Sequence, residues 1–202
     1  MLNTGIVAKF KDIVDKIRYD EINYIPSKID KPSKLAQTKS KAWVGLESII
    51  LDIINFSKID TQVALEFGVE FGYSTSVFAN YFEKVIGVDT FLGDIHAGHH
   101  GDLLEETKNN LRSFSNIELI KSDYKDFIKT KQGAFDLIHV DIVHTYEDTF
   151  ACGLWSARNS KCTLFHDTQS FPDVKRAVSD IAKETNKKFY NYKKFNGLGI
   201  LI

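Results

Sequence analysis

The chain has 202 residues, of which 43% are hydrophobic and 26% charged, as expected for one globular domain with a full core. The formal net charge of −1 at pH 7 offers no basic excess for a nucleic-acid partner, and the N-terminus lacks the apolar stretch and cleavage site of a signal peptide. Only Cys152 and Cys162 are present, without any zinc-ligand spacing, so we expect buried cysteines and a reducing, cytoplasmic setting.

The first third of the chain predicts a separate segment. Helical spacing of apolar residues predicts a helix over residues 5–18, and residues 21–39, with two prolines and several lysines, predict a mobile linker or lid. Residues 40–56 predict a second helix that is acidic in part and too short to span a membrane. We expect residues 1–60 to form a helical lid or cap and residues 61–202 the main domain. The two helices are candidates for pairing between subunits.

Beyond residue 61, short apolar runs alternate with helical stretches. The predicted strands are residues 63–67, 85–88, 117–120, 137–140 and 163–165. The predicted helices are residues 74–82, 103–114, 124–129, 147–157 and 173–185. Buried strands separated by helices indicate a parallel sheet. Residues 189–194 and 198–202, joined through Asn196-Gly197, predict an antiparallel hairpin. We therefore predict an α/β fold with a seven-stranded, mostly parallel sheet, helices on both faces and a C-terminal antiparallel hairpin.

The first predicted strand runs into the sequence LEFGVEFGYSTS. Glu66 closes the strand, Gly68 and Gly72 open a turn, and Ser74 begins a helix. Glycines permit tight dihedral angles and close approach of a ligand to the backbone. The spacing is G-x-x-x-G, so the G-x-G-x-x-G dinucleotide fingerprint is absent. A ligand-cradling turn and a simple strand-to-helix connection both fit this pattern.

Acidic residues end the next two strands. An acid at the position of Asp89 can accept hydrogen bonds from both ribose hydroxyls of a nucleoside. Asp123 and Tyr124 follow the third strand, where an acid and an aromatic ring suit an adenine base. Asp123 also suits the N-cap of the helix that follows, and the two roles are compatible.

The fourth and fifth strands end in a second polar group. The fourth ends at Asp141, with His144 in the loop that follows, and the fifth ends at His166 and Asp167. Ligands of open parallel sheets bind beyond the carboxyl ends of the strands, near the switch in strand order. We therefore expect these side chains to face one ligand site together with the acids of the earlier strands.

These motifs together resemble a known family. From Leu65 to Thr168 the chain resembles class I S-adenosylmethionine-dependent methyltransferases, with LEFGVEFGYST similar to their first motif. VDIVHTYED followed by LFHDT resembles the small-molecule O-methyltransferase branch, methyltransferase domain 24-like, whose usual forms are D-G-D-H-S-Y-E and H-D-T. That branch is related to macrolide-sugar and cephamycin-pathway methyltransferases. The resemblance implies a Rossmann-like sheet and S-adenosylmethionine as the cofactor.

The resemblance also implies roles for individual residues. The implied cofactor-binding residues are Glu66, Gly68, Gly72, Ser74, Asp89, Asp123 and Tyr124. The turn residues would shape the pocket for the amino-acid end of the cofactor, Asp89 would hold the ribose, and Asp123 with Tyr124 the adenine. The implied metal ligands are Asp141, His166 and Asp167, and the implied catalytic residues are His144, as general base, and Asp141.

Two departures from the family pattern concern the metal. The usual D-G-D-H is D-I-V-H here, so the middle acid is missing, and His166 replaces a more usual acid. Imidazole is a softer ligand than carboxylate, so Mn²⁺, Fe²⁺ or Zn²⁺ suits this set at least as well as Mg²⁺.

The sequence thus predicts O-methylation of a small molecule or sugar, with a divalent metal assisting and with neither nucleic acid nor membrane as a partner. Three alternatives stay open: a metal-free methyltransferase with His144 or His166 as lone base, a non-catalytic module that binds an adenosyl ligand, and a nicotinamide-dependent oxidoreductase. The missing dinucleotide fingerprint and the terminal hairpin argue against the last. His96, His99 and His100 fit an acceptor pocket, a metal site or a solvated loop, and Trp43 and Trp155 fit packing positions.

Overall fold

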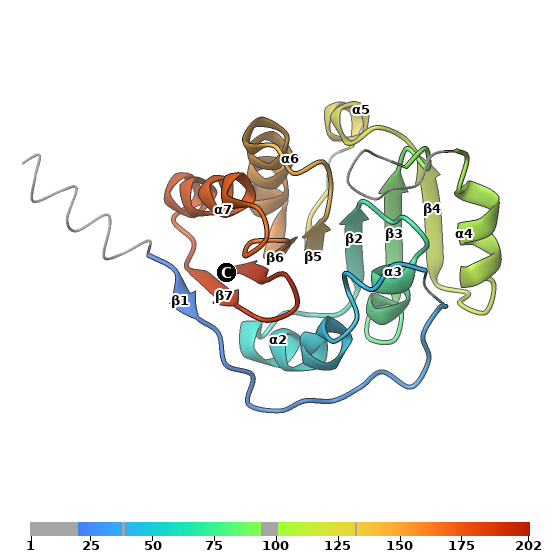
Figure 1. Cartoon of the computed structure of the whole chain (residues 1–202), viewed down its shortest axis with the longest axis horizontal. Coiled ribbons are helices and arrows are strands. Elements are labelled where there is room, and N and C mark those ends of the chain that lie inside the picture. Colours follow the sequence, from blue (N-terminus) through green and yellow to red (C-terminus); the bar gives the residue numbers. More distant parts are fainter. Residues whose placement is uncertain (1–19, 38, 94–100, 132) are drawn as a thin grey trace, which may run out of the picture.

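The computed structural model of the chain describes residues 20–37, 39–93, 101–131 and 133–202, and the predicted helix over residues 5–18 lies outside them. The described residues form one sheet with the order β1-β7-β8-β6-β5-β2-β3-β4 (Figure 1). The strands are β1 Ile22–Asn23, β2 Val63–Phe67, β3 Lys84–Asp89, β4 Ile117–Lys121, β5 Phe135–Val140, β6 Ser160–His166, β7 Phe189–Tyr192 and β8 Leu198–Leu201. The helices are the 3₁₀ helix η1 Leu46–Ile49, α2 Ile50–Ser57, α3 Tyr73–Phe78, α4 Leu104–Leu111, α5 Tyr124–Thr130, α6 Tyr146–Asn159 and α7 Pro172–Thr185.

The predicted α/β fold and its hairpin are confirmed. Strands β2 to β6 are parallel, and β8 runs antiparallel to both β6 and β7. The sheet has eight strands rather than seven, because the two-residue strand β1 adds parallel to β7 at the edge. Two residues are too few to produce an alternating pattern in the sequence, so this strand could not be predicted.

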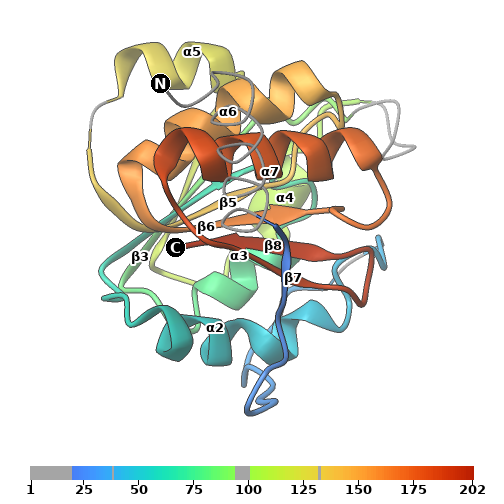
Figure 2. The same ribbon diagram turned by 90° about the vertical axis from the view of Figure 1, so that its left-hand side faces the viewer.

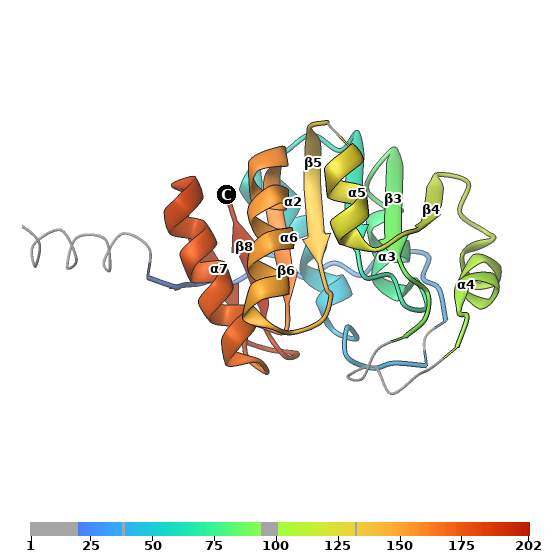
Figure 3. The same cartoon turned by 90° about the horizontal axis from the view of Figure 1, so that it is seen from above.

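Helices cover both faces of the sheet (Figure 2). One core packs α2 and α3 against side chains such as Ala64 and Leu137, and the other packs α5, α6 and α7 against their neighbours Leu65 and Ile138. Figure 3 shows α5, α6 and α7 side by side across that second face. Successive residues of each strand therefore supply opposite cores, which explains the nearly continuous apolar runs in the sequence. Both cysteines are buried and unbridged.

Two predicted helices differ from the observed ones by four residues or more, and the helix predicted over residues 103–114 ends earlier, at Leu111. The helix predicted over residues 40–56 starts only at Leu46, because a turn precedes it and Gly45 adopts a φ of 109°. The helix predicted over residues 74–82 ends at Phe78, where the chain turns back toward β3. Among the described residues, no helix is long and apolar enough to cross a membrane.

Residues 20–45, with residue 38 outside the description, form an extended segment that we call the strap. It leaves β1 and runs beside α2 to the neighbourhood of α3 (blue in Figure 1). Its backbone meets the domain at several points, including Asp30 N to Ser48 O at 2.8 Å and Ala36 N to Ser76 Oγ at 2.9 Å. The expected division at residue 60 stays a prediction, although α2 packs into the same core as the strands.

Candidate active site

A cavity of about 500 Å³ lies beyond the carboxyl ends of the central strands. Its wall includes residues that follow β2, β3, β4, β5 and β6, as well as part of the strap. Strand β2 lies between β5 and β3, so the order along the sheet switches at β2. This is the place where open parallel sheets bind ligands, and the volume suits a cofactor-sized molecule.

The glycine turn after β2 brings two strand ends together. Gly68 lines the cavity with a φ of 86°, and a Cβ atom at this position would lie 1.6 Å from the carbonyl oxygen of Asp141. A side chain is therefore excluded by both conformation and space. Gly72 also has a positive φ, 83°, but its missing Cβ faces the side chain of Leu111 and it does not line the cavity. The second glycine thus serves helix packing rather than direct ligand contact.

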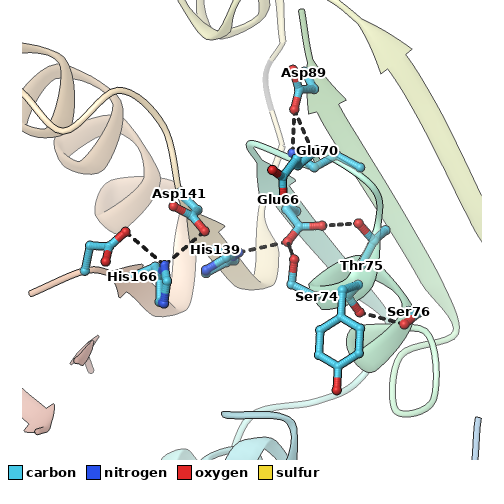
Figure 4. A network of polar contacts seen from close by, with 12 residues as sticks. Glu66, Glu70, Ser74, Thr75, Ser76, Asp89, His139, Asp141 and His166 are labelled. Carbon is cyan, nitrogen blue, oxygen red and sulfur yellow. Dashed lines mark hydrogen bonds and ion pairs between the residues drawn. The ribbon is translucent and has the colours of Figure 1, made fainter. Parts of the chain in front are cut away.

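Glu66 stabilises the start of the helix that follows the glycine turn. Its side chain is fully buried and accepts hydrogen bonds from Ser74 Oγ, at 2.5 Å, and from the Thr75 hydroxyl. His139 Nδ1 lies 2.9 Å from Glu66 Oε1, from the neighbouring strand β5 (Figure 4). Of these residues only Ser74 lines the cavity. The sequence reasoning overlooked His139, whose one indication was a polar residue inside a buried apolar strand.

Asp89, the last residue of β3, connects this strand to the glycine turn. Its Oδ2 atom accepts hydrogen bonds from the backbone N–H groups of Val69, at 2.7 Å, and Glu70, at 2.9 Å (Figure 4). Its Oδ1 atom accepts from Phe91 N at 2.7 Å. The carboxylate lines the cavity, at the position predicted for ribose binding, and it also fixes the turn that it faces.

Asp123 and Tyr124 line the same end of the cavity. Asp123 caps α5 by accepting from Lys125 N at 2.7 Å, as predicted for a helix N-cap. The Tyr124 hydroxyl donates to Asp148 Oδ1 at 2.7 Å, and burial together with this bond raises the pKa of Tyr124. Asp148 and Lys125 also line this end, and the sequence reasoning named neither as a site residue.

The opposite end holds the predicted Asp141, His144, His166 and Asp167, which we call the acid–histidine cluster. His166 Nδ1 lies 3.2 Å from Asp141 Oδ2 and 3.1 Å from Asp167 Oδ2. His144 Nε2 lies 2.9 Å from Asp167 Oδ2 and 3.7 Å from Asp141 Oδ1. Asp167 has a left-handed φ of 64°, so the chain leaves β6 with a sharp turn at this residue. The predicted convergence of the two strand ends is therefore present in the structure.

Opposite charges shift the ionisation of these groups. Burial disfavours the carboxylate of Asp141, but His166 and His144 outweigh it and hold the pKa of Asp141 well below its usual range. Burial likewise disfavours the imidazolium forms, yet the two carboxylates raise the pKa of His144 to about 9 and that of His166 to about 10. The pKa of Asp167 is lowered by both histidines despite its burial.

The two histidines differ in their access to the cavity. Asp141, His166 and Asp167 line it, as do Ile142 and Val143, which stand where the usual motif has Gly-Asp. His144 does not line it. Its ring stacks on Phe171, with centroids 4.1 Å apart and planes 11° apart. His144 thus contacts the carboxylates from outside the cavity wall.

The donor set of the cluster fits a divalent metal ion. Ligand atoms of Asp141, His144 and Asp167 all lie within 4.8 Å of one another, and this set contains His144 where the sequence predicted His166. Two carboxylates with an imidazole suit Mn²⁺, Fe²⁺ or Zn²⁺. The residues His96, His99 and His100, considered as alternative ligands, lie outside the described residues.

The strap supplies the remaining wall through Ser40, Ala42 and Trp43. Trp43 is 6% exposed and packs against buried rings, as predicted for a packing residue, but it also lines the cavity. Nothing in the apolar periodicity of the strap indicates this second role. Trp155 packs against Phe67 and Phe127 in the other core.

Comparison with known proteins decides the family. The family model described as "Methyltransferase domain" matches residues 65–168, which is half of the chain. The chain belongs to this family. It is an S-adenosylmethionine-dependent methyltransferase, and the nicotinamide-dependent alternative is thereby set aside. No curated protein matches the sequence.

Solved structures share the fold of this methyltransferase at low sequence identity. The O-methyltransferase NovP is 13% identical, with a TM-score of 0.63 over 96% of this chain and 98% of NovP. S-adenosylmethionine-bound CalS10, an amino pentose methyltransferase from Micromonospora echinaspora, is 12% identical, with a TM-score of 0.59 over 81% and 92% of the two chains. PH1948 from Pyrococcus horikoshii, which is described as a candidate RNA methyltransferase, is 15% identical, with a TM-score of 0.53 over 84% of this chain and 90% of PH1948. These likenesses show that the chain shares its fold with the three proteins.

Proposed function

We propose that this methyltransferase transfers the methyl group of S-adenosylmethionine to a hydroxyl group of a small molecule, with a divalent metal ion held in the acid–histidine cluster. The supporting observation is that three members of the cluster, Asp141, His166 and Asp167, line the same cavity as the glycine turn, Asp89 and Asp123. The backbone contact between Gly68 and Asp141 joins the two halves.

We expect the cofactor to lie in the cavity in one direction. The nucleoside would lie against Asp89, Asp123 and Tyr124, and the amino-acid end would run along Gly68 toward Ser74. S-adenosylmethionine, when bound, supplies an electrophilic methyl group on a sulfonium. The chain contributes binding and alignment of the two reactants, since an in-line displacement depends on their relative position.

The acid–histidine cluster would prepare the hydroxyl. An alcohol is a poor nucleophile at neutral pH and needs a base or a metal close to it. A divalent ion, when bound, lowers the pKa of a coordinated hydroxyl. Asp141 and Asp167 would be its carboxylate ligands, with one of the two imidazoles as third ligand. The carboxylates alone raise the pKa of both imidazoles, but the positive charge of a bound metal ion would favour the neutral form of the imidazole that is not a ligand. That imidazole would accept the proton, His166 from its place on the cavity wall or His144 through its contact with Asp167.

The proposal is tested by release of S-adenosylhomocysteine from S-adenosylmethionine with a panel of catechols and hydroxylated sugars, before and after treatment with a chelator. Turnover that a chelator abolishes and Mn²⁺ restores supports metal assistance. Turnover that a chelator leaves intact would instead favour the metal-free alternative, with a lone histidine base. Cofactor binding without turnover on any hydroxylated compound would favour the non-catalytic module.

Substitutions in the cluster separate the roles of its members. We expect Asp141→Asn to lower both metal content and turnover. Of His144→Ala and His166→Ala, one should lose the metal, and the other should keep the metal but lose activity. If both histidine variants and Asp141→Asn turned over an identified acceptor at the wild-type rate, the cluster would have no part in the reaction.

A further inference from the structure

Trp43 carries a hydrogen-bond donor that has no acceptor among the described residues. Its indole Nε1 is buried and makes no hydrogen bond in the described part of the chain, and the residue forms part of the cavity wall. An indole N–H can only donate, and buried tryptophans usually find an acceptor for it. A buried donor left unmatched costs about 1–3 kcal/mol. The structure therefore holds a donor whose acceptor does not come from these residues.

The indole lies beside the acid–histidine cluster. Its centroid is 6.1 Å from that of His166, and it meets His139 edge-on at 5.1 Å and 82°. On its third side it packs edge-on against Phe78 at 5.7 Å. The indole thus stands where the predicted amino-acid end of the cofactor and the hydroxyl acceptor would meet.

The strap holds Trp43 in place from both directions. Before it, Ala36 N donates to Ser76 Oγ on α3 at 2.9 Å, and Lys39 pairs with Glu106 on α4 at 2.6 Å. After it, Leu46 N donates to the Trp43 carbonyl at 3.1 Å where η1 begins. These contacts therefore hold the backbone of Trp43 close to the acid–histidine cluster.

We propose that Trp43 is a ligand-binding residue, and that its indole N–H donates a hydrogen bond to an oxygen of the ligand bound beside His166. The ligand chemistry is an oxygen acceptor on a molecule whose apolar part packs against the indole. This inference rests on the proposed function for the two molecules that bring such an oxygen: the amino-acid carboxylate of the cofactor and the hydroxylated acceptor. Because Nε1 is shielded from water, the proposal requires the indole to rotate slightly when the ligand enters.

The experiment follows the indole N–H resonances of the intact protein by ¹H–¹⁵N NMR. The chain has two tryptophans, Trp43 and Trp155, and the Trp43→Phe variant assigns its resonance by removing it. S-adenosylhomocysteine is added to one sample and 5′-methylthioadenosine, which lacks the amino-acid part, to a second. 1,2-Dihydroxybenzene is then added to the S-adenosylhomocysteine complex. Binding alone is measured, so the result does not depend on turnover.

Each outcome has a defined meaning. A downfield shift of the Trp43 resonance with S-adenosylhomocysteine, but not with 5′-methylthioadenosine, supports the proposal with the carboxylate as source. A shift that appears only after 1,2-dihydroxybenzene supports it with the acceptor as source. A resonance that no addition moves, or that both nucleosides move equally with no further change, overturns it.

The Trp43→Phe variant gives an independent measurement, because it keeps an aromatic ring and deletes the donor. If the carboxylate is the source, calorimetry should show S-adenosylhomocysteine binding weakened about five- to tenfold and 5′-methylthioadenosine binding unchanged. If the acceptor is the source, the loss should appear in 1,2-dihydroxybenzene binding to the complex. Trp155→Phe, which packs on Phe127 in the other core, is the matched control. Equal binding by the two variants for all three compounds contradicts the proposal.

Discussion

Replacing Gly68 by alanine probes the contact between the glycine turn and the end of β5. A Cβ atom at Gly68 would lie 1.6 Å from Asp141 O, where real Cβ atoms essentially never come closer than 3.0 Å. The obstacle is the backbone of Asp141, which cannot rotate away as a side chain can, so either the turn or the end of β5 must shift. The φ of 86° adds the strain of a left-handed conformation.

The two penalties can be separated by a matched variant. Gly101 also has a positive φ, 132°, but no atom of the described residues lies within 4 Å of its missing Cβ. We expect Gly101→Ala to lower the free energy of unfolding by about 1–2 kcal/mol, from conformational strain alone. Gly68→Ala adds an overpacking cost of about 1–3 kcal/mol, for a total of about 2–5 kcal/mol. A domain of this size has about 5–15 kcal/mol of stability, so part of the protein should stay folded.

The assay is urea unfolding followed by circular dichroism, with a thermal shift on adding S-adenosylhomocysteine as the functional reading. Gly68→Ala should reduce that thermal shift because it moves both the turn and Asp141, whereas Gly101→Ala should keep it. Equal losses of stability in the two variants, or an unchanged thermal shift in Gly68→Ala, would refute the steric argument.

Three further outcomes follow from contacts elsewhere. His139→Phe should lower the free energy of unfolding by about 2–4 kcal/mol in urea unfolding, because it removes a partner of the fully buried Glu66, and a loss below about 1 kcal/mol would contradict this. Asp123→Ala should lower the free energy of unfolding by about 1 kcal/mol, because α5 loses its N-cap. An unchanged free energy in the same titration would contradict this. Burial favours the protonated form of Glu21, but ion pairs such as that with Lys175 outweigh it and lower its pKa from 4.5 to about 2. The free energy of unfolding of the wild-type protein should therefore exceed that of Glu21→Gln by about 1–2 kcal/mol above pH 4.5, after allowance for solvent screening. The difference should shrink below pH 4.5 and be lost as the pH falls through about 2, and a pH-independent difference would be inconsistent with this linkage.

The fold was largely predictable because its strands are buried on both faces. Such strands are read as apolar runs with polar ends, and the ends of β5 and β6 came together as expected for neighbouring parallel strands. Asp123 was predicted correctly as a cap because N-capping is a local interaction. These features depend on residues that are close in the sequence or on the direction of neighbouring strands.

The rest depends on contacts between distant residues. The strap has no periodic pattern, and its anchors, such as Asp52 with Tyr24, join residues that sequence spacing does not relate. A tryptophan at position 43 looks the same in the sequence whether it packs in a core or lines a cavity. His139 belongs to an apolar run, and only the adjacent strand shows that Glu66 is its partner. Which distant residue Gly68 or Gly72 faces also depends on tertiary packing alone.

The left-handed backbone at Asp167 narrows which amino acids the position can hold. Neighbouring residues in a strand point to opposite faces, yet His166 and Asp167 both reach the same cluster, because the chain turns at Asp167 with a φ of 64°. Among side chains with an oxygen donor, asparagine and aspartate tolerate this conformation best. Glutamate would keep the charge and strain the backbone, whereas asparagine would keep the backbone and remove the charge. Any engineered change of the cluster's charge at this position is therefore confined to a single pair of amino acids.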